Sequence, residues 1–177
     1  MCGCSKRERE CGERVGERGE EVKECTVELV VSNATENLST VRKFVLDTLA
    51  KAGVCEKISR RIILAVDEAV SNIIRHAYEE FAKGTRTIDI KVCTHPGKKC
   101  VEITLRDSGK EFSPDEVETP NMSEHIRLRK KYGLGIFLIR KVMDEVNYMF
   151  RAGEENILRM VKYIKDEEME GGKYAGA

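Results

Sequence analysis

The chain has 177 residues, its 31 Lys and Arg residues are balanced by 31 Asp and Glu residues, and hydrophobic residues make up 41%. This length suits one domain with tails, and the apolar share allows a packed core. A net charge near zero gives no whole-molecule attraction to nucleic acid, so we expect no direct nucleic-acid partner. The absence of a long apolar run and of a signal-like N-terminus predicts a cytoplasmic protein that does not bind membranes.

The two ends of the chain differ in composition from its middle. Residues 1–24 are rich in Glu, Arg, Lys and Gly, and residues 167–177 hold several glycines. Segments with so little apolar content bury too little surface to offset the entropy lost on ordering. We therefore predict two flexible tails around one ordered domain over residues 25–166.

Hydrophobic periodicity divides the middle of the chain into helices and strands joined by short turns. In chain order it predicts a strand over Cys25–Ser32, a helix carrying Leu38, Val41, Val45 and Leu49 that stops at Gly53, a helix over 56–79, strands over Thr87–Thr94 and Cys100–Arg106, a polar loop over 113–132, a helix over Gly135–Val146, and strands over Asn147–Arg151 and Ile157–Ile164. Hairpin-linked strands with helices on one face predict an α+β fold, a two-layer α/β sandwich.

The helix over 56–79 carries polar residues at the edge of its apolar stripe. At about 100° per residue, Glu68 and Asn72 fall together there, and His76 continues the row one turn later. A carboxylate partly removed from water suits a general base, and an amide oxygen can ligate Mg²⁺. Taken alone, the pair fits better a polar i,i+4 pair on the solvent side of a core helix. His76 is either a packed or capping histidine or part of the same site.

The third strand runs directly into an Asp-Ser-Gly turn at Asp107 to Gly109. A carboxylate at a strand end can accept a hydrogen bond from an exocyclic amine such as that of adenine. Gly109 has no Cβ atom, so a flat base can lie against its backbone. The alternative is an ordinary turn, because these residue types are common in turns.

The polar loop ends at a glycine-spaced run, Tyr132-Gly133-Leu134-Gly135, where a helix begins. The free N–H groups and the positive dipole end of a helix N-terminus favour phosphate. Lys131, just before the run, can reach a phosphate as a point charge. A flexible hinge with a glycine cap is the alternative, since this is neither a dinucleotide-binding pattern nor a Walker loop.

The three motifs in this order resemble those of the GHKL (Bergerat) ATPases, the group of gyrase B subunits, MutL and histidine-kinase catalytic domains. The resemblance covers roughly residues 25–166, and it implies a mixed, mainly antiparallel sheet with helices on one face. The motifs similar to the N box, the adenine-binding box and the second glycine box are Glu68-x-x-x-Asn72, Asp107-x-Gly109 and Gly133-x-Gly135.

Within that group, Asp67–Tyr78 and Gly133–Val146 look most like the small anti-sigma-factor serine kinases. This resemblance implies a homodimer that binds a sigma factor and, with ATP and Mg²⁺, phosphorylates a serine of a STAS-type antagonist protein. A kinase acting on a phosphatase or a stressosome-type scaffold is the alternative. So is a partner-switching module in which ATP only orders a lid.

The resemblance also implies a role for each matched residue. Glu68 would take the serine proton and Asn72 would bind Mg²⁺, while Asp107 would bind the adenine amine with Gly109 beneath the base. The other implied binding residues are Gly133, Leu134 and Gly135 around the phosphates, Lys131 near the γ-phosphate, and His76 and Phe112 along the pocket wall. Two departures are that Glu111 replaces a second glycine and that Asn156 and Ile157 stand where some members have Thr.

Other members of the group fit less well. A histidine kinase needs a helical domain with a phospho-accepting histidine upstream of the ATP domain, and none of the three histidines precedes that domain. Gyrase-like and MutL-like functions need a further domain, which we do not expect at this length. The presence of Glu68 at the position of the base favours a kinase over a module that only binds ATP.

Overall fold

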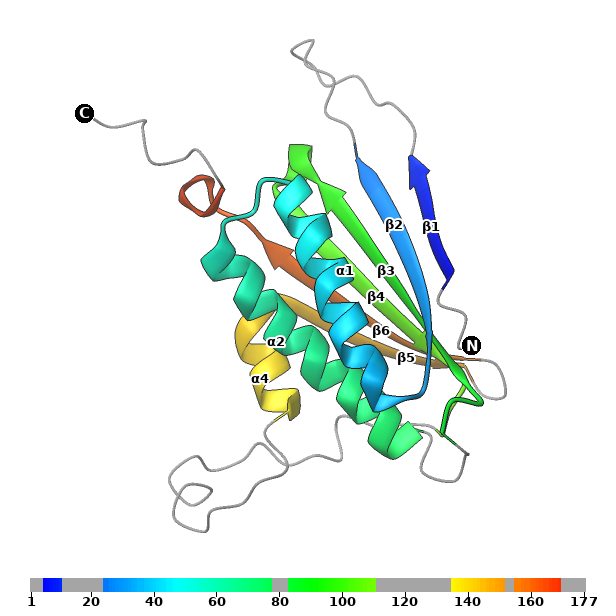
Figure 1. The fold of residues 1–177 in the computed structure, drawn as a ribbon. Coiled ribbons are helices and arrows are strands. Elements are labelled where there is room, and N and C mark those ends of the chain that lie inside the picture. Colours follow the sequence, from blue (N-terminus) through cyan, green and yellow to red (C-terminus); the bar gives the residue numbers. More distant parts are fainter. Residues whose placement is uncertain (1–4, 11–23, 78–82, 111–134, 152–154, 170–177) are drawn as a thin grey trace, which may run out of the picture.

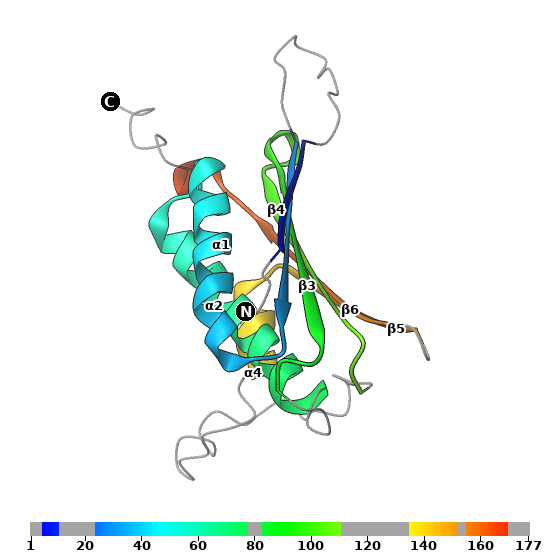
Figure 2. The same cartoon turned by 45° about the vertical axis from the view of Figure 1, so that its right-hand side comes forward.

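A computed structural model describes residues 5–10, 24–77, 83–110, 135–151 and 155–169. Its strands form one six-stranded sheet in the order β1-β2-β3-β4-β6-β5, and every neighbouring pair is antiparallel. The helices cover one face of this sheet, and none of the described helices lies on the other face (Figures 1 and 2). The predicted two-layer α+β sandwich is therefore confirmed, with a sheet that is antiparallel throughout rather than mixed.

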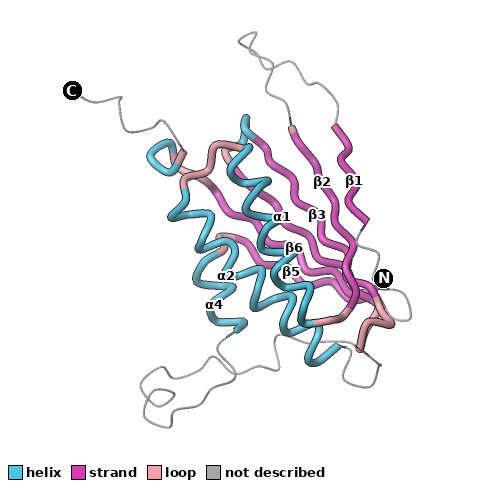
Figure 3. Tube along the Cα trace, viewed as in Figure 1, coloured by secondary structure: helices cyan, strands magenta, loops and turns pink. Residues whose placement is uncertain are grey.

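The helices and strands follow one another along the chain in the predicted order, with β1 as an additional strand at the start. The strands are β1 (Ser5–Glu10), β2 (Cys25–Ser32), β3 (Thr87–His95), β4 (Cys100–Asp107), β5 (Glu145–Arg151) and β6 (Glu155–Tyr163). The helices are α1 (Leu38–Lys51), α2 (Glu56–Asn72) and α4 (Gly135–Val142), with a π-helical turn at Ile73–Ala77 and 3₁₀ turns at Thr35–Asn37, Pro96–Lys98 and Asp166–Glu168. Helix α2 lies between α1 and α4 (Figure 3).

Both helices that carry site residues end earlier than predicted. Regular α-helix stops at Asn72 in α2, and the next five residues form the wider π-helical turn, a feature that often marks functional sites. Helix α4 stops at Val142 rather than Val146. Val146 instead belongs to β5, where it pairs with Met160 of β6 and packs against the core.

The two predicted tails are partly ordered. Ser5–Glu10 pairs with β2 as an edge strand, because backbone pairing does not need apolar side chains and charged edge strands are common. At the other end, the Glu168 carbonyl accepts a hydrogen bond from the Cys55 N–H at 2.8 Å, and Met169 forms a bridge with Val54. Residues 11–23 and 170–177 lie outside the described part of the chain.

The core lies between the sheet and the helices. Alternate residues of β4, Val101, Ile103 and Leu105, face the helices and are at most 2% exposed. Because side chains alternate along a strand, the same face receives Asp107 at the end of β4. The strand therefore carries a carboxylate to the border of the core. Among the described residues, no helix is long and apolar enough to cross a membrane.

Candidate functional site

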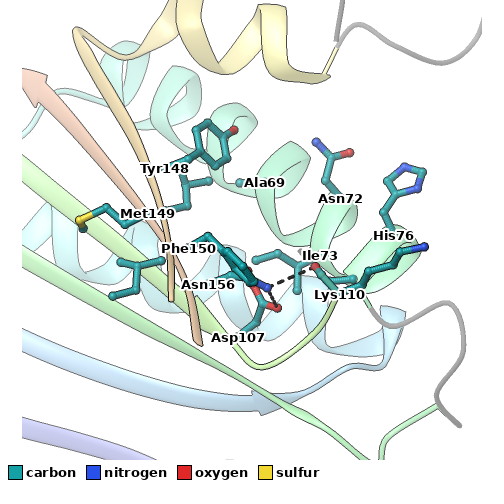
Figure 4. Close-up of a pocket in the computed structure, with 13 residues that line it drawn as sticks. Ala69, Asn72, Ile73, His76, Asp107, Lys110, Tyr148, Met149, Phe150 and Asn156 are labelled. Atoms are coloured by element: carbon teal, nitrogen blue, oxygen red, sulfur yellow. Dashed lines mark hydrogen bonds between the residues drawn. The ribbon is translucent and has the colours of Figure 1, made fainter. Parts of the chain in front are cut away.

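A cavity of about 190 Å³ opens where the C-terminal part of α2 meets the ends of β4, β5 and β6 (Figure 4). Its wall combines apolar side chains with a few polar ones, as is usual for small-molecule sites. The lining residues are Ala69, Asn72, Ile73, His76, Ala77, Asp107, Lys110, Tyr148, Met149, Phe150, Asn156, Ile157 and Leu158.

Asp107 is the buried acid of this cavity, with 7% of its surface exposed. Its Oδ1 atom accepts hydrogen bonds from the Gly109 N–H at 2.8 Å and from Asn156 Nδ2 at 3.0 Å. Burial raises the pKa of Asp107, while the hydrogen bonds from Asn156 and Gly109 act against that rise. The result is a fixed carboxylate at the cavity wall that can accept a hydrogen bond from a ligand amine.

Gly109 is required by the packing of the turn against the end of α2. A Cβ atom at this position would lie 2.5 Å from both the Cβ and the carbonyl oxygen of Ala77. The next residue, Lys110, donates its N–H to the same Ala77 oxygen at 2.9 Å. The turn after β4 is thus joined to the π-helical turn, and only glycine permits this approach.

Glu68, Asn72 and Gly135 lie together, although they come from different motifs. Helices α2 and α4 pack side by side, and both Glu68 and Asn72 are half-buried on α2. A Cβ atom on Gly135, the first residue of α4, would lie 2.9 Å from Glu68 Oε2 and 3.1 Å from Asn72 Nδ2. The start of a helix, where free N–H groups attract anions, is therefore placed beside an acid and an amide.

His76 lines the cavity one turn beyond Asn72, and its side chain is exposed (Figure 4). This position favours the interpretation of His76 as a pocket residue over a packed histidine. Four predicted binding residues, Phe112, Lys131, Gly133 and Leu134, lie outside the described residues, as does the polar loop over 113–132. Their roles stay predictions.

Sequence reasoning missed the cavity residues of β5, and it noted Asn156 and Ile157 of β6 only as departures from the family pattern. Tyr148, Met149 and Phe150 line one wall of the cavity, and burial raises the pKa of Tyr148 to about 12. Asn156 lies opposite Asp107 in the β4–β6 pairing. The aromatic residues of β5 were the only local indication that this strand lines a cavity. The strand register that brings β5 and β6 to the site cannot be read from the local sequence.

Asp107→Asn should stabilise the fold at neutral pH. Burial raises the pKa of Asp107 in the folded state above its value in the unfolded chain. The free energy of unfolding therefore falls as the pH rises through the folded-state pKa and the buried side chain ionises. An asparagine keeps the acceptor oxygen without the charge. We expect a higher melting temperature than wild type at about pH 7 and an equal one at about pH 3, where both side chains are neutral. Circular dichroism measures both, and a lower melting temperature at about pH 7 would contradict the prediction.

Proteins similar in sequence to this chain cover most of its length. Residues 31–162 match the family described as histidine kinase-like ATPase domain. The serine-protein kinase RsbW of Staphylococcus epidermidis is 29% identical over 147 residues, which cover 81% of this chain and 89% of that protein. The protein of the same name from Staphylococcus aureus strain MSSA476 is 28% identical over 151 residues, covering 83% of this chain and 92% of its own.

The fold also resembles a solved structure, the RsbU and RsbW domains of Rv1364c from Mycobacterium tuberculosis. The TM-score is 0.51 at 17% identity, and the likeness covers 77% of this chain and 32% of that one. The family resemblance predicted from the three motifs is confirmed, because the matched segment spans well over half of the chain. The chain belongs to the histidine kinase-like ATPase domain family.

Proposed function

We propose that this chain is an ATP-dependent serine kinase and anti-sigma factor that binds a sigma factor and phosphorylates a serine of a STAS-type antagonist. The observation that carries the proposal is the placement of Glu68 and Asn72 against the first residue of α4, beside a cavity with a buried carboxylate. The similarity to proteins named serine-protein kinase RsbW, over most of their length, supports the same reaction.

The cavity suits the adenine end of ATP. Its apolar wall can enclose a flat base, and the fixed Asp107 carboxylate accepts a hydrogen bond from an exocyclic amine. The phosphates would then extend toward the start of α4, where Gly135 leaves room beside Asn72. Mg²⁺ usually takes one or two protein oxygens and completes its shell with phosphates and water, so the Asn72 amide oxygen fits it.

In phosphoryl transfer the protein acts mainly by positioning and by neutralising charge. Bound Mg²⁺ would neutralise charge on the phosphates. Glu68 would accept the proton of the substrate serine as its oxygen bonds to the γ-phosphorus and the bond to ADP breaks. The half-buried position of Glu68 on a packed helix holds the carboxylate in place for that transfer.

The remaining parts of the proposal follow from the family resemblance. We propose a cytoplasmic homodimer with a sigma factor and an antagonist protein as its macromolecular partners. A kinase for a phosphatase or scaffold partner is the second candidate, because partner choice depends on surface residues outside the catalytic site. The presence of Glu68 at the position of the base favours both of these over a module that only binds ATP.

Glu68→Gln should abolish transfer while leaving ATP binding intact. Loss of a general base lowers the transfer rate by about 10²–10⁴-fold, whereas the amide keeps the shape of the side chain. Transfer from radiolabelled ATP to a candidate antagonist measures the rate, and calorimetry measures ATP affinity. The matched control is Glu56→Gln, which changes an exposed acid of the same helix and should keep the wild-type rate. Unchanged transfer by Glu68→Gln would show that Glu68 is not the base.

Gly135→Ala should slow transfer with little loss of stability. The added methyl group would meet the ends of the Glu68 and Asn72 side chains, which can rotate away and so spare the fold. A displacement of about 1 Å in a catalytic group lowers rates by about 10²-fold. We expect a wild-type melting temperature with a much lower transfer rate. Wild-type transfer by this variant would contradict the placement of Glu68 and Asn72 at the reacting phosphate.

A further inference from the structure

Asn156 and Asp107 face each other across the last pair of the β4–β6 ladder. Both side chains lie on the helix-covered face, because they are two residues along their strands from the buried pair of Leu105 in β4 and Leu158 in β6. Beyond this pair β4 ends and the chain turns through Gly109 and Lys110. Asn156 therefore stands beside the turn after β4.

The amide of Asn156 contacts three oxygens of this turn. Its Nδ2 atom lies 3.0 Å from Asp107 Oδ1, 3.2 Å from the Gly109 carbonyl oxygen and 3.3 Å from the Lys110 carbonyl oxygen (Figure 4). All three are hydrogen-bond acceptors, so only the NH₂ end of the amide can face them. Its two hydrogens are shared among three acceptors, which ties the side chain and the backbone of the turn to β6.

The turn is held from two further directions. The Gly109 N–H donates to Asp107 Oδ1, and the Lys110 N–H donates to the carbonyl of Ala77, the last residue of the π-helical turn. Asn156 supplies a direct side-chain link between β6 and this turn. Its hydrogen bond also favours the ionised carboxylate, which burial would otherwise disfavour through a raised pKa.

We propose that Asn156 is a positioning residue that determines base specificity by holding the Asp107 carboxylate ready for the exocyclic amine of adenine. This inference rests on the proposed function, since it places adenine in the cavity. A carboxylate held in this way only accepts hydrogen bonds, so it selects a purine that presents an amine and rejects one that lacks it. The Asn156 amide has two hydrogens to donate to the turn, whereas a threonine hydroxyl at the same position would have one.

The test compares ATP with purine riboside 5′-triphosphate, which has the same ring and phosphates without the amine. Calorimetry in the presence of Mg²⁺ gives the ratio of the two affinities for wild type, Asn156→Leu and Asn147→Leu. Asn147 is an exposed asparagine on the opposite face of the sheet, in β5, and is the matched control. Wild type and Asn147→Leu should prefer ATP equally.

Asn156→Leu should lower the preference for ATP by about tenfold or more, while affinity for the purine analogue changes by less than about threefold. Asn156→Thr, which keeps one donor, should give an intermediate ratio of the affinities for ATP and the analogue. If the leucine variant does not fold, the threonine variant provides the test. Equal weakening of both nucleotides would mean that Asn156 only stabilises the fold and would overturn the inference, as would an unchanged ratio in the folded variants.

The experiment separates this inference from the proposed function. A wild-type chain that binds neither triphosphate overturns the proposed function and the inference with it. A wild-type chain that prefers ATP, together with an Asn156→Leu or Asn156→Thr variant that shows the same preference, overturns the inference alone and leaves the kinase proposal standing.

Discussion

Burial of α2 between the sheet and its neighbouring helices is the constraint on which the candidate site depends, both at the cavity with Asp107 and at the group of Glu68 and Asn72. Ile62, Ala65, Val66 and Ala69 are almost completely buried, so the rotation of the helix about its own axis is set by the core. That rotation leaves Glu68 and Asn72 half-buried at the edge of the apolar stripe. The residues proposed for chemistry are thus held by the same packing that stabilises the domain, rather than by a separate loop.

Two close approaches then join other segments to α2 and to the π-helical turn that follows it, and each occurs at a glycine. Gly135 brings the start of α4 against Glu68 and Asn72, and Gly109 brings the turn after β4 against Ala77. A Cβ atom on Gly109 would collide with the backbone of Ala77, whereas one on Gly135 would meet only the movable ends of the Glu68 and Asn72 side chains. Glycine therefore serves here to allow contact between elements, in addition to any contact it makes with a nucleotide.

The buried acid of the cavity suits the proposed function but lowers the stability of the fold. Placing Asp107 at the border of the core disfavours its ionised form, as its raised pKa indicates, yet an ionised acceptor is what the proposed adenine contact needs. Hydrogen bonds from Gly109 and Asn156 offset part of that penalty. A site that retains a buried charge in this way trades some stability for selectivity.

Local sequence predicted the strands well where alternation was strong. The predicted strand over Cys25–Ser32 matches β2 in both bounds, and β3 and β4 each extend one residue beyond the prediction. The prediction failed for β1, since its charged side chains carry no apolar signal and its order comes from backbone pairing with β2. It also failed at the end of α4, where pairing with β6 draws Glu145 and Val146 into a strand.

Sequence alone was enough to predict the fold class, the family and six described residues of the candidate site, Glu68, Asn72, His76, Asp107, Gly109 and Gly135, because periodicity and short motifs are local properties of the chain. Only the tertiary structure placed Gly135 against Glu68 and brought Asn156 to Asp107, and only it showed that Tyr148 and Phe150 line the cavity. These contacts depend on strand register and helix packing, which are decided by the burial of side chains far apart in the sequence.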